Sequence, residues 1–240
     1  MSALLHRGPV PEVAVLAAGL VEELHPLLRE LAGRDPRPRW QRAAAAAALL
    51  RAAVEDPCRA MVLAARERAV DGDVHVRAEG ADPDTAALRH ALRVWAVLRT
   101  AGAAGRAPEP GDAERYVSGQ RSSAVLLGAE PDDLPGTLEE VEADVERVRG
   151  DVLAGRPAAA LSAVGPPPAA PPRPRSPFPD AGGAPAPWAR ATLLAGAVLP
   201  GWARALFTGA PDDLGGPGDP RLREALARLP DLGAAPARPR

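Results

Sequence analysis

The residue best suited to chemistry in this chain is His90, at the edge of an apolar helix face that includes Leu88, Leu92 and Trp95. An imidazole in such a place can bind a metal ion, line a cofactor pocket or form a hydrogen bond within the core. The alternative to a functional role is an ordinary hydrogen-bonded core histidine. We therefore take His90 as the first candidate for a cofactor or metal ligand.

Two arginines form the second candidate group. Arg39 and Arg42 are three residues apart and thus one helical turn from each other. Side chains with this spacing can hold one carboxylate or propionate together. The alternative is a pair of solvated arginines at a helix start.

Several chemistries lack support in the sequence. None of the four histidines, His6, His25, His75 and His90, is three or four residues from another, so no helix face presents two ready metal ligands. The chain has no G-x-S-x-G sequence, phosphate loop, H-E-x-x-H motif or dinucleotide fingerprint. The corresponding hydrolase, zinc-peptidase and nucleotide-binding classes have no motif here.

Composition limits the partners and the compartment. The 29 basic and 31 acidic residues leave a formal net charge of −2 with no block of like charge, so no nucleic-acid partner is expected. The single cysteine, Cys58, excludes an internal disulfide. No stretch reaches the roughly 18 uninterrupted apolar residues of a membrane span, and no secretory signal is evident, so we expect a cytoplasmic protein.

Periodicity and helix-start signals predict an all-α protein of seven to nine helices, with an alanine-rich helix at its centre. Asp82-Pro83 and the capping box at Thr137 to Glu140 mark two of the helix starts. The expected helices cover 11–31 with a bend at Pro26, 38–54, 58–70, 82–98, 111–127, 137–152, 188–207 with a break near Pro200, and 219–229.

We expect residues 1–240 to form a single multi-helix domain. The proline-rich stretch at about 165–187 is incompatible with a continuous helix and predicts a flexible loop within the domain. The tail at about 231–240 is expected to fray.

Six short segments of the chain resemble motifs of a known family in their order and spacing. In chain order they are Asp35-Pro36 followed by Arg39 and Arg42, Glu67 to Gly72, Asp82-Pro83 followed by His90 and Leu92, Leu126-Leu127-Gly128, Leu134-Pro135-Gly136-Thr137, and Leu199-Pro200 followed by Arg204. In order and spacing they resemble the oxygenase MpaB-like family, which includes the latex-clearing proteins that cleave polyisoprene with a b-type haem. The similarity extends over roughly residues 13 to 230.

The resemblance implies an all-α domain of the latex-clearing-protein type that holds haem b and acts as an oxidoreductase on a small apolar substrate. It implies catalytic roles for Arg39 and Arg42, haem contacts for Arg39, His90 and Glu67, and iron coordination by His90, with His75 as the other histidine available. Three family positions differ: Glu67 replaces the axial haem histidine, Ala43 a threonine and Gly119 a glutamate.

Three hypotheses follow. The chain is a divergent haem enzyme, a haem-less family member that serves as a binding or scaffold protein, or a generic all-α interaction protein whose likeness is compositional. The first is the primary hypothesis and the second is its alternative. The combined differences at Glu67, Ala43 and Gly119 support the second, and a carboxylate is a poor replacement for an imidazole in holding haem b. The sequence predicts neither the substrate nor the oligomeric state.

Overall fold

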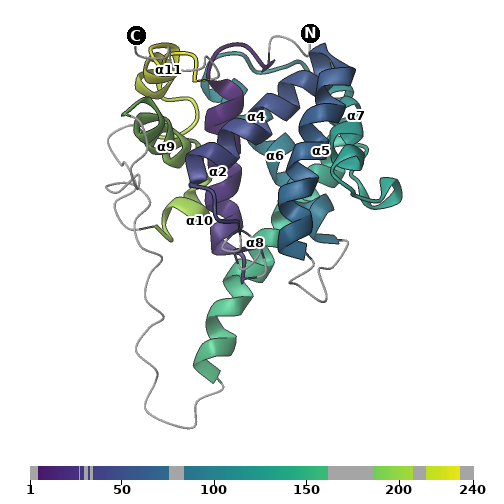
Figure 1. The fold of residues 1–240 in the computed structure, drawn as a ribbon. Coiled ribbons are helices and arrows are strands. Elements are labelled where there is room, and N and C mark those ends of the chain that lie inside the picture. Colours follow the sequence, from purple (N-terminus) through teal and green to yellow (C-terminus); the bar gives the residue numbers. More distant parts are fainter. Residues whose placement is uncertain are drawn as a thin grey trace.

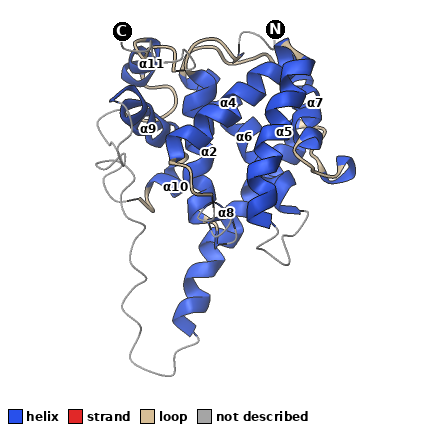
Figure 2. Ribbon diagram, in the orientation of Figure 1, coloured by secondary structure: helices blue, strands red, loops and turns tan. Residues whose placement is uncertain are grey.

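The computed structural model describes residues 5–26, 28–29, 32, 35–75, 84–161, 186–207 and 215–232. Every regular element in these ranges is a helix, which confirms the all-α prediction (Figures 1 and 2). The elements are α2 (Val10–Leu24), α4 (Arg39–Glu55), α5 (Pro57–His75), α6 (Asp84–Ala103), α7 (Pro110–Leu126), the 3-10 turn η1 (Pro131–Asp133), α8 (Leu138–Leu161), α9 (Ala186–Val198), α10 (Gly201–Arg204) and α11 (Pro220–Ala227).

The first predicted helix is interrupted at its expected bend. Helix α2 ends at Leu24, because His25 has an extended backbone with φ −81° and ψ 126°. The ring of Pro26 disfavours helical geometry at the residue before it, so His25 leaves the helix. Helical backbone resumes at Pro26, and the Arg29 N–H donates to the His25 carbonyl at 2.9 Å, so the predicted bend is a break between two helical segments. Helices α5 and α8 instead run further than predicted, to His75 and Leu161.

Two predicted helix starts are confirmed by their hydrogen bonds. The Thr137 Oγ1 accepts a bond from the Glu140 backbone N–H at 3.2 Å, and the Glu140 carboxylate accepts from the N–H groups of Gly136 and Thr137. These reciprocal bonds form the capping box of α8. At α11 the Asp219 carboxylate accepts from the Arg221 N–H at 2.8 Å.

The central helix is α2 and not the alanine-rich helix that the sequence favours for this place. Almost every side chain of α2 is buried, as expected of a helix enclosed on all sides. It packs against α4, α6 and α9 (Figure 1). Helix α4 is buried along one side only, because Arg39, Gln41, Arg42 and Arg51 along its length keep partial access to solvent. The small side chains of α4 instead allow close approach of α5, where Ala60 and Ala64 pack on Leu49 and Ala52.

Of the predicted loop at 165–187, residues 165–185 lie outside the described residues, and 186–187 begin α9. Of the predicted tail at 231–240, only Asp231 and Leu232 are described. In the part of the chain that the structure describes, no helix is both long and apolar enough to cross a membrane.

Leu92 on α6 is fully enclosed in the main core. Leu92→Ala should lower the free energy of unfolding by about 2–5 kcal/mol, because it removes buried methyl groups and leaves a cavity. Urea denaturation measures this, with Leu153→Ala on α8 as the control, since Leu153 is 41 % exposed. Equal losses in both variants would contradict the placement of α6 in the core.

Candidate functional site

Three adjoining cavities bring the sequence-predicted residues into one region. All three have Ala46, Arg89 and Arg93 in their walls. The His90 cavity, of ≈ 70 Å³, has walls from α4, α6 and α7. The Arg39 cavity, of ≈ 60 Å³, lies against α2, α4 and α6, and the Glu67 cavity, of ≈ 50 Å³, against α4, α5 and α6.

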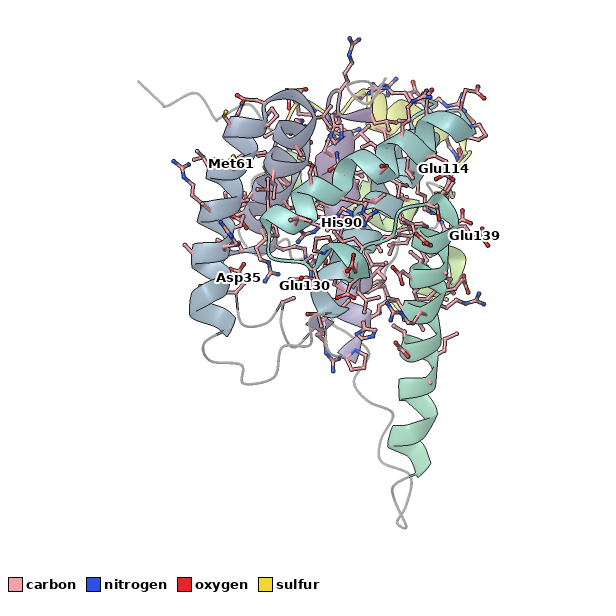
Figure 3. All side chains as sticks on the ribbon, turned by 90° about the vertical axis from the view of Figure 1, so that its right-hand side faces the viewer. Asp35, Met61, His90, Glu114, Glu130 and Glu139 are labelled. Carbon is pink, nitrogen blue, oxygen red and sulfur yellow. The ribbon has the colours of Figure 1, made fainter. Side chains whose placement is uncertain are left out.

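His90 lies inside the helical body and is 5 % exposed (Figure 3). Its ring lines the His90 cavity, and its Nε2 has no hydrogen-bond partner among the described residues. Burial lowers the pKa of His90 to about 4, and the positive charges of Arg93 and Arg121 act in the same direction. The imidazole is therefore neutral near pH 7, the form that binds a metal ion or exchanges a hydrogen bond with a neutral or anionic ligand.

Arg39 and Arg42 both line the Arg39 cavity, but they bind different groups. The Arg39 guanidinium pairs with the Glu23 carboxylate of α2, with 2.9 Å between Nε and Oε1. Arg42 donates instead to the backbone carbonyls of Ala32 and Asp35. Burial lowers the pKa of Arg42. In this structure the two arginines do not hold one carboxylate together.

Glu67 lines the Glu67 cavity, where Arg37 binds both of its carboxylate oxygens. The Arg37 Nη1 donates to Oε1 at 2.8 Å, and Nη2 donates to Oε2 at 2.9 Å. Arg37 also binds Asp35, with 2.8 Å between Nη2 and Oδ2. Burial alone would raise the pKa of Asp35, but the hydrogen bonds and charge of Arg37 lower it. We call these three side chains the Arg37 triad.

The sequence reasoning missed three of the arginines at this site. Arg89 and Arg93 flank His90 on α6, and Arg89 pairs with Glu22 of α2 at 3.2 Å. Their spacing of four residues places them on one helix face and was a usable signal. Arg37 offered no such signal, because its partner Glu67 is 30 residues away in the sequence.

The remaining candidate positions contribute less to the site. The side chain of His75 lies outside the described residues. Ala43, where the resemblance expects a threonine, is buried in the wall of the Arg39 cavity, whereas Gly119 is exposed on α7. Among the described side chains, no group of three or more histidine, cysteine, aspartate or glutamate residues is arranged to hold a metal ion.

The Arg37–Glu67 pair should show substantial energetic coupling, because both side chains are mostly shielded from solvent, at 23 % and 19 % exposure. A double-mutant cycle with Arg37→Met and Glu67→Gln should give a coupling of about 1–3 kcal/mol in the free energy of unfolding. The control is the surface pair Arg149–Glu146 on α8, where a coupling below about 0.5 kcal/mol is expected. Coupling no greater than that of the surface pair would contradict the two-bond geometry.

The free energy of unfolding should fall as the pH is lowered from about 6.5 to 5, a range that lies above the usual pKa values of carboxylates. Burial lowers the pKa values of both His90 and His6 to about 4, so below pH 6.5 the unfolded chain binds protons that the folded chain does not. The free energy of unfolding should drop by about 1 kcal/mol per pH unit for each histidine between about pH 6.5 and 5, since the unfolded histidine takes up its proton over this range. Urea denaturation across this range measures the slope. His90→Gln should reduce the slope by about half; an unchanged slope would contradict a buried neutral His90.

Comparisons with known proteins identify the family. The model of the family described as ER-bound oxygenase mpaB/B'/Rubber oxygenase, catalytic domain, matches residues 4–229. No curated protein and no solved structure matches the chain. The matched range contains all three cavities and every candidate residue discussed above. The chain therefore belongs to the family of mpaB/B' and rubber oxygenase catalytic domains.

Proposed function

We propose that this chain is a member of the oxygenase family that binds a small molecule in its central cavities and does not hold haem b at the family's histidine position. The observation that carries the proposal is the two-bond contact between Arg37 and Glu67. This contact lies where the resemblance expects the axial ligand of haem iron.

The chemistry of the Glu67 position supports this proposal. Haem iron in proteins is held by histidine, cysteine, methionine or tyrosine. Glu67 offers a carboxylate, and both of its oxygens already accept hydrogen bonds from Arg37. Freeing Glu67 for iron would leave the Arg37 charge without one of its two carboxylates, and breaking a partly buried pair is costly. The donor set at this position therefore does not fit haem b.

The available space supports it as well. A cavity of roughly 150 Å³ holds one benzene molecule. The His90, Arg39 and Glu67 cavities, of ≈ 70, ≈ 60 and ≈ 50 Å³, are each smaller than that, whereas a porphyrin is several times larger than benzene. The side chains of Arg89 and Arg93 border all three. The region suits a small ligand.

A second candidate function is haem-dependent oxidation of a small apolar substrate, with His90 as the iron ligand. The observation in its favour is the neutral, buried imidazole whose Nε2 has no described partner. Haem b bound there would supply oxygen chemistry. Arg39 would be available for a propionate only by exchanging its contact with Glu23. This candidate requires the cavities to widen.

The absorption spectrum and iron content of the full chain, expressed with a supply of haem, distinguish the two candidates. We expect a folded, colourless and iron-free protein, because neither the ligand position nor the space suits a porphyrin. A Soret band with near-stoichiometric iron would overturn the primary proposal. If His90→Ala then removed the band, His90 would be identified as the ligand.

Glu67→His provides a complementary measurement. It restores the family's ligand residue, but it leaves the small cavities unchanged, so we expect no gain in haem binding. A Soret band in Glu67→His that is absent from the parent would show that the ligand residue alone, and not the space, prevents haem binding. Circular dichroism of both proteins controls for loss of the fold.

A further inference from the structure

We propose that the His90 cavity binds a small amphipathic monocarboxylate, with its carboxylate at the α6 wall and its alkyl group against the leucines of α4 and α7. This inference rests on the proposed small-molecule function and specifies its ligand class. The two walls of the cavity differ in chemistry, and each matches one end of such a molecule.

The apolar wall is built from the sides of two helices. Leu49 and Leu50 on α4 and Leu127 at the end of α7 line it, together with small alanine side chains. A short alkyl group placed there would leave water for an apolar surface, and burial of each CH₂ group is favourable.

The residues that α6 contributes are mainly basic. Arg89, His90 and Arg93 line the cavity, and none of the described residues that line it is an aspartate or glutamate. Arg89 also pairs with Glu22 of α2, at 3.2 Å, which orders its guanidinium. Arginine donors recognise carboxylates through strong charge-assisted hydrogen bonds. The α6 wall therefore favours an anion over a neutral or cationic ligand.

The unpartnered Nε2 of His90 is the independent sign of a ligand. A buried polar atom without a hydrogen bond is costly, so such atoms are uncommon in folded proteins and point to a missing partner. A neutral imidazole with its proton on Nε2 would donate that proton to a ligand carboxylate. The positive charges that lower the pKa of His90 would likewise attract the anion.

The volume sets the size of the ligand. The His90 cavity, of ≈ 70 Å³, is smaller than the roughly 150 Å³ cavity that holds a benzene molecule, so its ligand must be small and its alkyl group short. Butyrate is a short molecule with both chemical ends. We therefore use butyrate as the probe and n-butanol and n-butylamine as neutral and cationic analogues of similar length.

The experiment is a titration of the purified full chain with each probe, followed by NMR of the ligand and of the His90 imidazole. We expect butyrate to bind at least about 10-fold more tightly than butanol and butylamine not to bind, because only the anion gains charge-assisted hydrogen bonds. Butyrate should also shift the His90 signals. Equal binding of butanol and butyrate would overturn the carboxylate class and leave small-molecule binding intact.

Variants test where the carboxylate lies. Arg93→Gln should weaken butyrate binding by about 10-fold and leave the weak binding of butanol unchanged. The control is Arg121→Gln, which removes the same charge from α7; Arg121 acts on His90 electrostatically but is not among the lining residues. It should change the affinity by less than about 3-fold. Equal losses in both variants, or none in Arg93→Gln, would overturn the assigned carboxylate position.

Failure of binding by all three probes would overturn this inference alone, because the proposed function names no ligand class. The haem measurement tests the proposed function separately, since it depends on the spectrum of the protein and not on these probes. Circular dichroism of each variant confirms that a loss of binding is not a loss of the fold.

Discussion

The pairing of buried charges between helices is the constraint on which the rest of this structure depends. Central helix α2 carries Glu12 and Glu22 into the interior, where their side chains are 1 % and 7 % exposed. A carboxylate so removed from water requires a cationic partner. Arg51 of α4 pairs with Glu12, and Arg89 of α6 pairs with Glu22. These contacts fix the position of α2 along both neighbours, since sliding a helix by one turn would separate the charges.

Arginines of the same helices also line the cavities. Arg89 and Arg93 border all three cavities, and Arg89 at the same time pairs with Glu22. His90 lies between them on α6, and its burial beside positive charge keeps the ring neutral. The polar character of the site thus follows from the way in which the helices are joined.

The Arg37 triad lies at the position where the resemblance expects the axial haem ligand. Glu67 carries a negative charge at this mostly buried position, where it needs compensation. Arg37 provides it through two parallel hydrogen bonds and is itself held by Asp35. The substitution at Glu67 is therefore part of a connected set of interactions. This connection favours a structural use of the position over iron binding.

The sequence by itself determined the helices and the family. Helices depend on residues close together in the chain, and the family is identified by the order of short motifs along it. Apolar periodicity located the main helices, and the capping box of α8 and the Asp219-Pro220 start of α11 depend on residues within one turn. Motif order identified the family that the match over residues 4–229 confirms. Even the early end of α2 has a local cause, at Pro26.

Only the tertiary structure decided which polar side chains meet. Arg37 and Glu67 are 30 residues apart, and Arg89 and Glu22 are 67 apart. Their contacts follow from helix packing, so no periodic pattern in the sequence predicts them. For the same reason Arg39 and Arg42, one turn apart on a single helix, bind different partners. The unpartnered Nε2 of His90 is likewise a property of its surroundings. The hydrogen-bond partner of a buried polar side chain depends on the tertiary structure, because helix packing determines which polar groups lie within hydrogen-bond distance.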